Sequence, residues 1–187
     1  MRVLGIDPGL RITGYACLES IGASLLGQVR IIEAGCFRIG KPGASTDDLL
    51  PKTAATLSSR LQELDRDFRE LLERTRPSVV AIESIFAHYK HPATAIIMGH
   101  ARGVLLLAVR QCGLELLEFK PNLVKKGMTG HGLAKKDQMQ RAVQSYFNLP
   151  EPPNPPDVAD ALAIALCAIR RAEIGAQTSD FAVIRQA

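Results

Sequence analysis

The chain has 187 residues, 47% of them apolar and 22% charged, which suits one globular domain with a core of its own. A formal net charge of +4 favours polyanionic partners only mildly, because many basic proteins bind no nucleic acid. The four cysteines lack zinc-binding spacing, which favours buried, reduced thiols. The N-terminus is not a signal peptide, and the longest apolar stretch, 104–109, is too short to cross a bilayer. We therefore expect a cytoplasmic protein.

Three strand-like segments open the chain. Residues 2–6 are an apolar run that ends at Asp7 and is followed by a Pro-Gly turn, which is typical of a buried strand. Residues 14–19 and 28–39 are two further strand candidates, with glycines between them. Their short connections predict an antiparallel meander.

A long helix is expected after a loop at residues 41–45. Its apolar residues alternate at spacings of four and three, which predicts a stripe that faces the core rather than a coiled coil. The stripe consists of Leu50, Ala54, Leu57, Leu61, Leu64, Phe68 and Leu71. The helix should end at Arg76-Pro77, before a short buried strand, 79–82, that leads into Glu83.

The second half alternates helices and strands. Residues 92–111 form a helix that is apolar around most of its circumference, so it is either a buried core helix or a dimer seam. The later elements are a strand at 114–119, helices at 121–126 and 135–147, a proline-rich segment at 149–156 and an apolar helix at 157–172. This order predicts an α/β fold, a mixed five-stranded sheet with helices on both faces, in one domain, 1–174, followed by a tail, 175–187.

Four acidic residues stand where the chain has reason to avoid them. Asp7 and Glu83 each end a buried strand, and ligands of α/β sheets bind outside the carboxyl ends of strands. Asp157 and Asp160 are three residues apart at the start of an apolar helix, so both project from one face. If these positions converge, the carboxylates repel one another unless hard cations such as Mg²⁺ or Mn²⁺ lie between them. Two such ions can activate water and stabilise the leaving oxygen in phosphodiester hydrolysis.

Each acid also has an ordinary structural interpretation. Asp7 can belong to a common Asp-Pro-Gly turn, and Glu83 can be a charge at a strand end that faces water. Asp157 can be an N-cap, and Asp160 can favour the helix dipole. It is the set of four, on these elements, that favours a metal site.

Four segments of the chain form a recognisable set: GIDPGLRITGY (5–15), AIESIF (81–86), ARG (101–103) and DVADALAIA (157–165). Together they resemble the RuvC family of Holliday junction resolvases. They occur in the family's order, and the similarity runs from about residue 3 to residue 170.

This resemblance implies an RNase H-like fold, a homodimer and nicking of four-way junctions that depends on Mg²⁺, with Mn²⁺ able to substitute. The residues that match the family's catalytic, metal-binding carboxylates are Asp7, Glu83, Asp157 and Asp160. The branch-migration proteins RuvA and RuvB are possible partners, and the implied products carry 5′-phosphate and 3′-hydroxyl ends.

The same resemblance suggests DNA contacts. Phe86 matches an aromatic residue near the crossover, and Lys125 and Lys136 match basic positions near the scissile phosphate or the backbone. Lys90 is a further candidate, in a loop that departs from the family's usual sequence. Lysines and an arginine make residues 120–141 locally basic, which is either a solvated face or a DNA-binding flank.

Three other functions fit parts of the pattern. Another RNase H-like nuclease would prefer a different nucleic acid, such as an RNA–DNA hybrid. An ATP-binding domain of the actin and sugar-kinase type also begins with a glycine-rich Asp turn, but 187 residues are few for that duplicated fold. A junction-binding protein without catalysis would not need all four acids.

Overall fold

The structure is a computed structural model and describes residues 1–9, 12–21, 28–38, 53–84 and 92–174. Five strands form one sheet in the order β3-β2-β1-β4-β5. The strands are β1 (Arg2–Asp7), β2 (Ile12–Ile21), β3 (Gln28–Arg38), β4 (Val79–Glu83) and β5 (Glu115–Phe119). β1, β2 and β3 pair antiparallel, whereas β4 runs parallel to β1 and to β5. The predicted mixed sheet and antiparallel meander are therefore confirmed.

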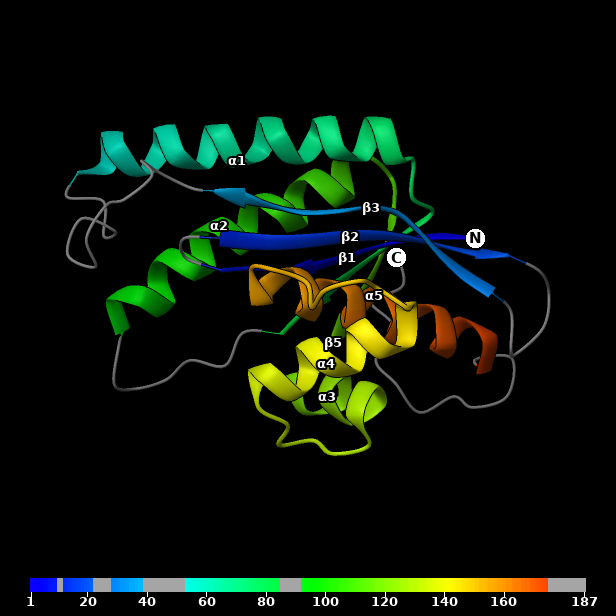
Figure 1. The fold of residues 1–187 in the computed structure, drawn as a ribbon. Helices are drawn as coiled ribbons and strands as arrows, with labels where there is room; N and C mark the ends of the chain where they lie inside the picture. The colour runs from blue at the N-terminus through cyan, green and yellow to red at the C-terminus, as the bar shows by residue number, and fades with distance from the viewer. Residues whose placement is uncertain (10–11, 22–27, 39–52, 85–91, 175–187) are drawn as a thin grey trace.

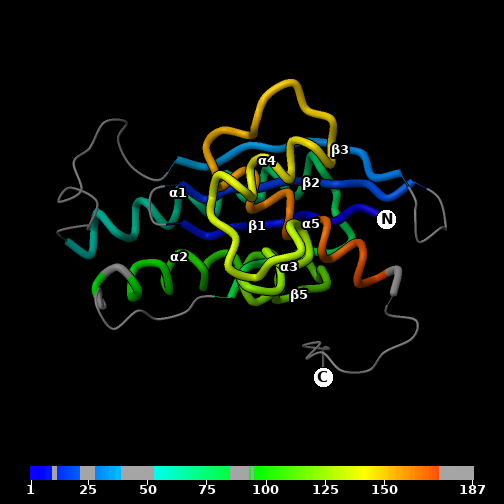
Figure 2. Tube along the Cα trace, turned by 60° about the horizontal axis from the view of Figure 1, so that its bottom comes forward, coloured from blue at the N-terminus to red at the C-terminus, as the bar shows by residue number. Residues whose placement is uncertain are grey.

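Helices cover both faces of this sheet (Figure 1). On one face lie α1 (Ala54–Thr75) and α2 (Pro92–Gln111), and on the other lie α3 (Pro121–Thr129), α4 (Lys136–Phe147) and α5 (Pro156–Ile174). Figure 2, turned from that view, shows α3, α4 and α5 in front of the strands. None of the helices in the described part of the chain is long and apolar enough to span a membrane.

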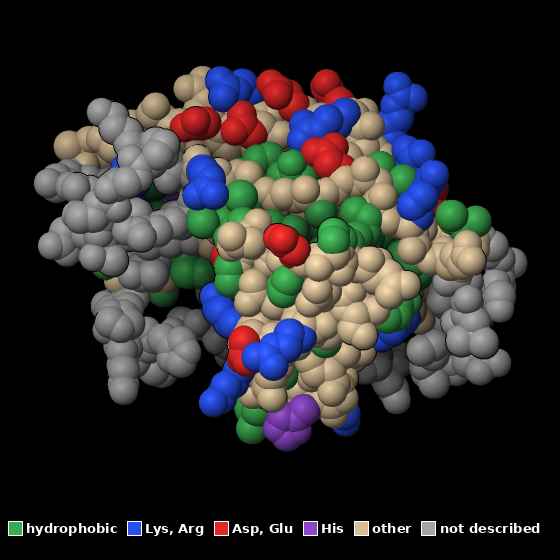
Figure 3. Space-filling view, in the orientation of Figure 1, with side chains coloured by type: hydrophobic (Ala, Val, Ile, Leu, Met, Phe, Trp, Pro, Cys, Tyr) green, Lys and Arg blue, Asp and Glu red, His purple; other side chains and the backbone are tan. Residues whose placement is uncertain are grey.

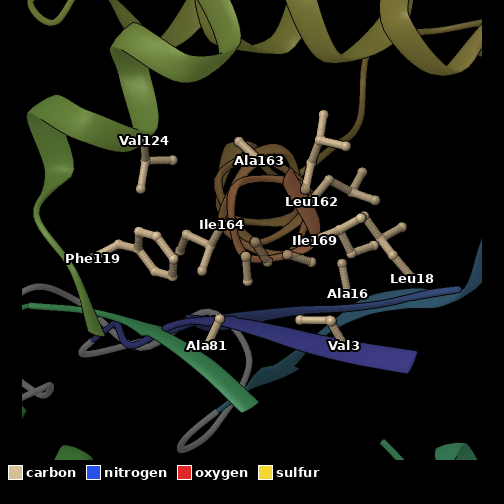
Figure 4. Packing of buried hydrophobic residues seen from close by; sticks show 14 of the residues in the cluster. Val3, Ala16, Leu18, Ala81, Phe119, Val124, Leu162, Ala163, Ile164 and Ile169 are labelled. Atoms are coloured by element: carbon tan, nitrogen blue, oxygen red, sulfur yellow. The ribbon is translucent and has the colours of Figure 1, made fainter. Parts of the chain in front are cut away.

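Side chains along β1 alternate between two hydrophobic cores. Leu4 and Ile6 enter the core beneath α1 and α2, whereas Val3 enters the core beneath α5. Figure 4 shows α5 end-on above the sheet, with Val3, Ala16 and Ala81 on the strands that face it. Apart from Asp160 and Cys167, all of residues 158–169 are buried. The reason is that strands lie on one side of α5 and helices α3 and α4 on the other.

Two glycines let the backbone of α5 lie directly on the sheet. A Cβ atom on Gly5 would lie 2.3 Å from the carbonyl oxygen of Ala161. One on Gly14 would lie 2.0 Å from the carbonyl oxygen of Asp157, which is closer than real Cβ contacts allow. The first turn of α5 is therefore fixed against β2, beside the end of β1.

The long helix α1 is buried along only part of its predicted stripe. Thr53 caps its start by accepting a hydrogen bond from the Thr56 N–H at 3.1 Å, and it ends at Arg76-Pro77 as predicted. Its buried residues begin at Leu64; Ala54 is exposed, and Leu50 lies outside the described residues. Figure 3 shows acidic and basic side chains side by side along its outer surface. The expectation that the whole stripe faces the core was too broad, because the first turns of the helix lie beyond the core under it.

The interpretation of α2 as a fully buried core helix is wrong. Ala101, Leu105 and Ala108 pack into the core, but Ile96 is 61% exposed and Leu107 is 57% exposed. The glycines between these two residues are exposed as well. One apolar face of α2 therefore has no partner within the described part of the chain.

Candidate active site

The candidate site lies where β1 and β4 end. These strands are parallel neighbours in register, with Ile6 beside Ile82, so Asp7 and Glu83 stand next to one another at the same edge of the sheet. Asp157 and Asp160 lie in the first turns of α5, which Gly14 holds against the sheet. A Cβ atom on Gly9, just after Asp7, would lie 3.7 Å from Oδ1 of Asp157. Strand ends and helix start thus converge, which is the condition on which the predicted metal site depends.

Electrostatic interactions show that the four acids share one site. The pKa of Asp7 lies well above its ordinary value, first because its carboxyl is buried and then because Glu83, Asp160 and Asp157 add negative charge around it. Lys136 opposes this shift. The negative charge gathered around Asp7 leaves a site that needs added positive charge.

Glu83 and Asp160 show the effect of the same crowding. Burial and the charge of Asp160 raise the pKa of Glu83 to about 7. Burial raises the pKa of Asp160, and Asp157 raises it further. Lys125 and Lys136 lower the pKa of both groups. These two lysines, from α3 and from the start of α4, therefore border the carboxylates.

The carboxylate set fits a hard divalent cation in its chemistry. All four acids offer oxygen ligands, and the raised pKa values of Asp7, Glu83 and Asp160 reflect burial and a shortage of positive charge. In the described residues, however, no three acidic, histidine or cysteine side chains stand close enough to hold one ion together as placed. The acids are therefore gathered at one end of the sheet, with their side chains not yet arranged around a single point.

The geometry also decides between interpretations of single acids. Asp157 is not an N-cap: α5 begins one residue earlier, at Pro156, and the N–H of Val158 donates to the carbonyl of Pro155 at 3.0 Å. Proline suits the first helical position, where the backbone N–H has no partner within the helix. The Asp157 side chain is therefore not needed to cap α5.

Other predicted contacts lie outside the described residues. Phe86 and Lys90 belong to the segment 85–91, and the predicted tail, 175–187, is also outside. Within the basic segment 120–141, Arg141 pairs with Asp137 at 3.1 Å on the outer surface of α4.

Sequence reasoning missed a residue that supports this site. On α4, Gln140 donates from Nε2 to the carbonyl of Pro153 at 2.8 Å and so anchors the proline-rich segment that leads into α5. One turn further, Gln144 holds the start of that segment through the carbonyls of Leu149 and Pro150. Gln140 is four residues after Lys136, so the two residues lie on one face of the helix. That spacing is the sequence feature from which Gln140 could have been predicted.

Comparison with known proteins identifies the family. The family model for crossover junction endodeoxyribonuclease RuvC matches residues 3–168. The chain belongs to the RuvC family. The RuvC of Rhodopirellula baltica is 41% identical over 165 residues, 88% of this chain and 84% of that one.

Solved structures of RuvC agree in fold. That of Thermus thermophilus RuvC matches with a TM-score of 0.75 at 30% identity, covering 94% of this chain and 97% of that one. A structure of T. thermophilus RuvC in complex with a Holliday junction substrate matches with a TM-score of 0.74 at 27% identity, with the same coverage of both chains. The fold of this RuvC-family chain is therefore RNase H-like, as the resemblance implied.

Proposed function

We propose that this chain is a metal-dependent endonuclease that resolves Holliday junctions by paired, symmetric nicks. The observation that carries the proposal is the convergence of four carboxylates and two lysines at one edge of an RNase H-like sheet, in a member of the RuvC family. A nuclease domain spanning residues 1–174 contains all of these groups.

In this proposal the four acids hold Mg²⁺, and Mn²⁺ can take its place; they are Asp7, Glu83, Asp157 and Asp160. When bound, the cations activate a water and stabilise the leaving oxygen of the phosphodiester. Lys125 and Lys136 offset the charge that the acids share and face the phosphates of the incoming strand. Phe86 and Lys90 are proposed as further DNA contacts.

The decisive experiment compares a labelled four-way junction with linear duplex and with an RNA–DNA hybrid of the same sequence, in Mg²⁺, Mn²⁺ or EDTA. We expect symmetric nicks in the junction alone, lost in EDTA. Preference for the hybrid would support another RNase H-like activity. Junction binding without cleavage in either metal would support a non-catalytic binding protein.

The exposed face of α2 supports a homodimer. Ile96, Gly99, Gly103 and Leu107 follow one another at spacings of three or four, so they lie on one side of the helix. The apolar ends of this stripe are exposed, and glycines between them allow a second helix to approach closely. A two-fold dimer also places two identical sites on two strands of a junction with approximate two-fold symmetry.

Leu107→Glu is therefore expected to turn the dimer into a monomer and to uncouple the two nicks. Leu107 is exposed within the protomer, so the fold should persist while a charge enters the proposed seam. Sedimentation measures the mass, and a plasmid carrying an extruded cruciform separates single nicks from paired cuts. Ile21→Glu, at an exposed residue on β2, is the control. A Leu107→Glu protein that remains dimeric would contradict this assignment of the seam.

Lys136→Ala is expected to weaken junction binding and to lower the slope of log Kd against log salt by roughly one unit, because one phosphate contact is lost. Binding titrations from about 50 to 200 mM salt give that slope. Arg141→Ala is the control, since Arg141 already pairs with Asp137 on the outer surface of α4. An unchanged slope for Lys136→Ala would rule out this phosphate contact.

A further inference from the structure

The loop between α3 and α4 presents an exposed leucine beside the candidate active site. Leu133 is 82% exposed, more than any other large hydrophobic residue in the described part of the chain. Single exposed leucines are common on protein surfaces and need no explanation by themselves. Two further features, the fixed shape of this loop and its position, distinguish Leu133 from such residues.

Hydrogen bonds fix the shape of the loop. The Thr129 hydroxyl lies 2.8 Å from the carbonyl oxygen of Lys125 and 3.0 Å from that of His131, and it accepts the His131 N–H at 3.1 Å. A Cβ atom on Gly132 would lie 3.1 Å from the carbonyl oxygen of Asn122, so the loop rests on the start of α3. A side chain on such a loop loses little backbone freedom when it binds a partner.

The chain turns so that the Leu133 side chain faces water while that of the next residue packs inward. Ala134, the next residue, is 3% exposed and packs into the core beneath α5. The N–H of Ala134 donates to the carbonyl of His131 at 3.2 Å, which closes the turn with Leu133 inside it. Leu133 is therefore held out from the protein surface by its two anchored neighbours.

The position of the loop places Leu133 at the edge of the carboxylate site. Lys136, three residues after Leu133, begins α4. Near that end of α4, Gln140 donates to the carbonyl of Pro153 at 2.8 Å, four residues before Asp157, so this end of the helix lies beside the segment that leads into α5. The loop that ends at α4 is therefore on the side of the molecule from which a DNA strand can reach the start of α5.

We propose that Leu133 is a DNA contact that packs against the deoxyribose and base edges next to the cleaved phosphate; this rests on the function proposed above. Sugars and base edges are the apolar surface that remains when lysines bind the neighbouring phosphates, and other proteins insert leucine against base steps in this way. The contact adds affinity without adding charge.

That difference gives the test. Three proteins are compared: the Asp157→Asn protein, which should not cleave, and the same protein with Leu133→Ala or Leu133→Met added. Their affinity for the junction is measured across a range of salt concentrations. We expect Leu133→Ala to raise Kd about tenfold at every salt concentration, as for loss of a partly buried leucine side chain, with an unchanged salt slope. Leu133→Met should restore most of the affinity, because methionine has a similar apolar volume.

Two controls separate this contact from general effects. Lys135→Ala, two residues after Leu133, should lower the salt slope, because it removes a charge. Ile21→Ala should change nothing, because β2 runs antiparallel to β1 and Ile21 lies at the end of the sheet remote from Asp7. Equal affinity of Leu133 and Leu133→Ala would overturn the proposal, as would a Leu133→Ala effect that acts on the slope alone. Failure of the protein with Leu133 intact to bind or cut junctions would instead overturn the proposed function.

Discussion

Replacing Asp7 by Asn is expected to lower junction cleavage by more than roughly 100-fold and, in EDTA at pH 8, to raise the free energy of unfolding. The first effect follows because Asp7 is a proposed metal ligand. The second follows because its carboxyl is buried among Glu83, Asp160 and Asp157, so the ionised form is costly in the folded state. An amide has a similar shape and carries no charge. The same substitution should therefore inactivate the protein and stabilise it.

The pH dependence has a definite sign. The pKa of Asp7 is higher in the folded chain than in the unfolded chain, so the folded state holds its proton over a wider range. Below the unfolded value, near 4, both states are protonated and there is no penalty. As pH rises above that value, the unfolded chain ionises first and stability falls, until the folded group ionises too. Without metal the protein should therefore lose stability between pH 5 and pH 8.

Urea unfolding in EDTA at pH 5 and at pH 8 measures this effect. We expect Asp7→Asn to be more stable than the unsubstituted protein by on the order of 1–3 kcal/mol at pH 8, with a smaller difference at pH 5. Added Mg²⁺ should stabilise the protein with Asp7 and reduce the difference, because a ligand that binds the folded state raises its stability. The control is Asp137→Asn on the surface of α4, which should show neither effect. A less stable Asp7→Asn protein at pH 8 would contradict the proposed repulsion.

The elements that build the site could be predicted from local sequence. Asp7 and Glu83 each follow an apolar run that is too short for a helix and is followed by a turn or a polar segment, which predicts a strand. In the structure these two runs are the neighbouring strands β1 and β4. Asp157 and Asp160 share a helix face because their spacing fixes it. What local sequence left open was whether strand ends and helix start meet, because that depends on packing across the sheet.

The parts that sequence left open depend on contacts between distant residues. The apolar pattern of α2 does not tell a buried helix from one with an unpartnered face, since both are rich in leucine and alanine; only its neighbours decide that Leu107 is exposed. The hydrogen bond from Gln140 to Pro153 joins two segments whose relative position no periodicity encodes. Lys125 and Lys136 were found by family resemblance, because a lysine in a basic segment has no local feature that separates a site residue from a solvated one.

Gly14→Ala is expected to separate the acids of α5 from those of the sheet. Its new methyl group would lie 2.0 Å from the carbonyl oxygen and 2.5 Å from the carbonyl carbon of Asp157, and backbone atoms cannot rotate away as a side chain can. The first turn of α5 must shift, which should destabilise the fold by roughly 1–3 kcal/mol. A displacement of about 1 Å in a catalytic group can lower a rate by about 100-fold, so cleavage should fall even where the protein remains folded.

Gly5→Ala provides the matched comparison. Its methyl group would meet α5 further along, 2.3 Å from the carbonyl oxygen of Ala161 and 2.6 Å from the backbone nitrogen of Ala165. Both substitutions should lower the free energy of unfolding, measured with urea. Gly14→Ala should reduce cleavage more for the same loss of stability, because its clash is at Asp157 itself. If cleavage by the two folded variants falls only in proportion to their stability, then close packing of α5 holds the fold together without setting the position of the acids.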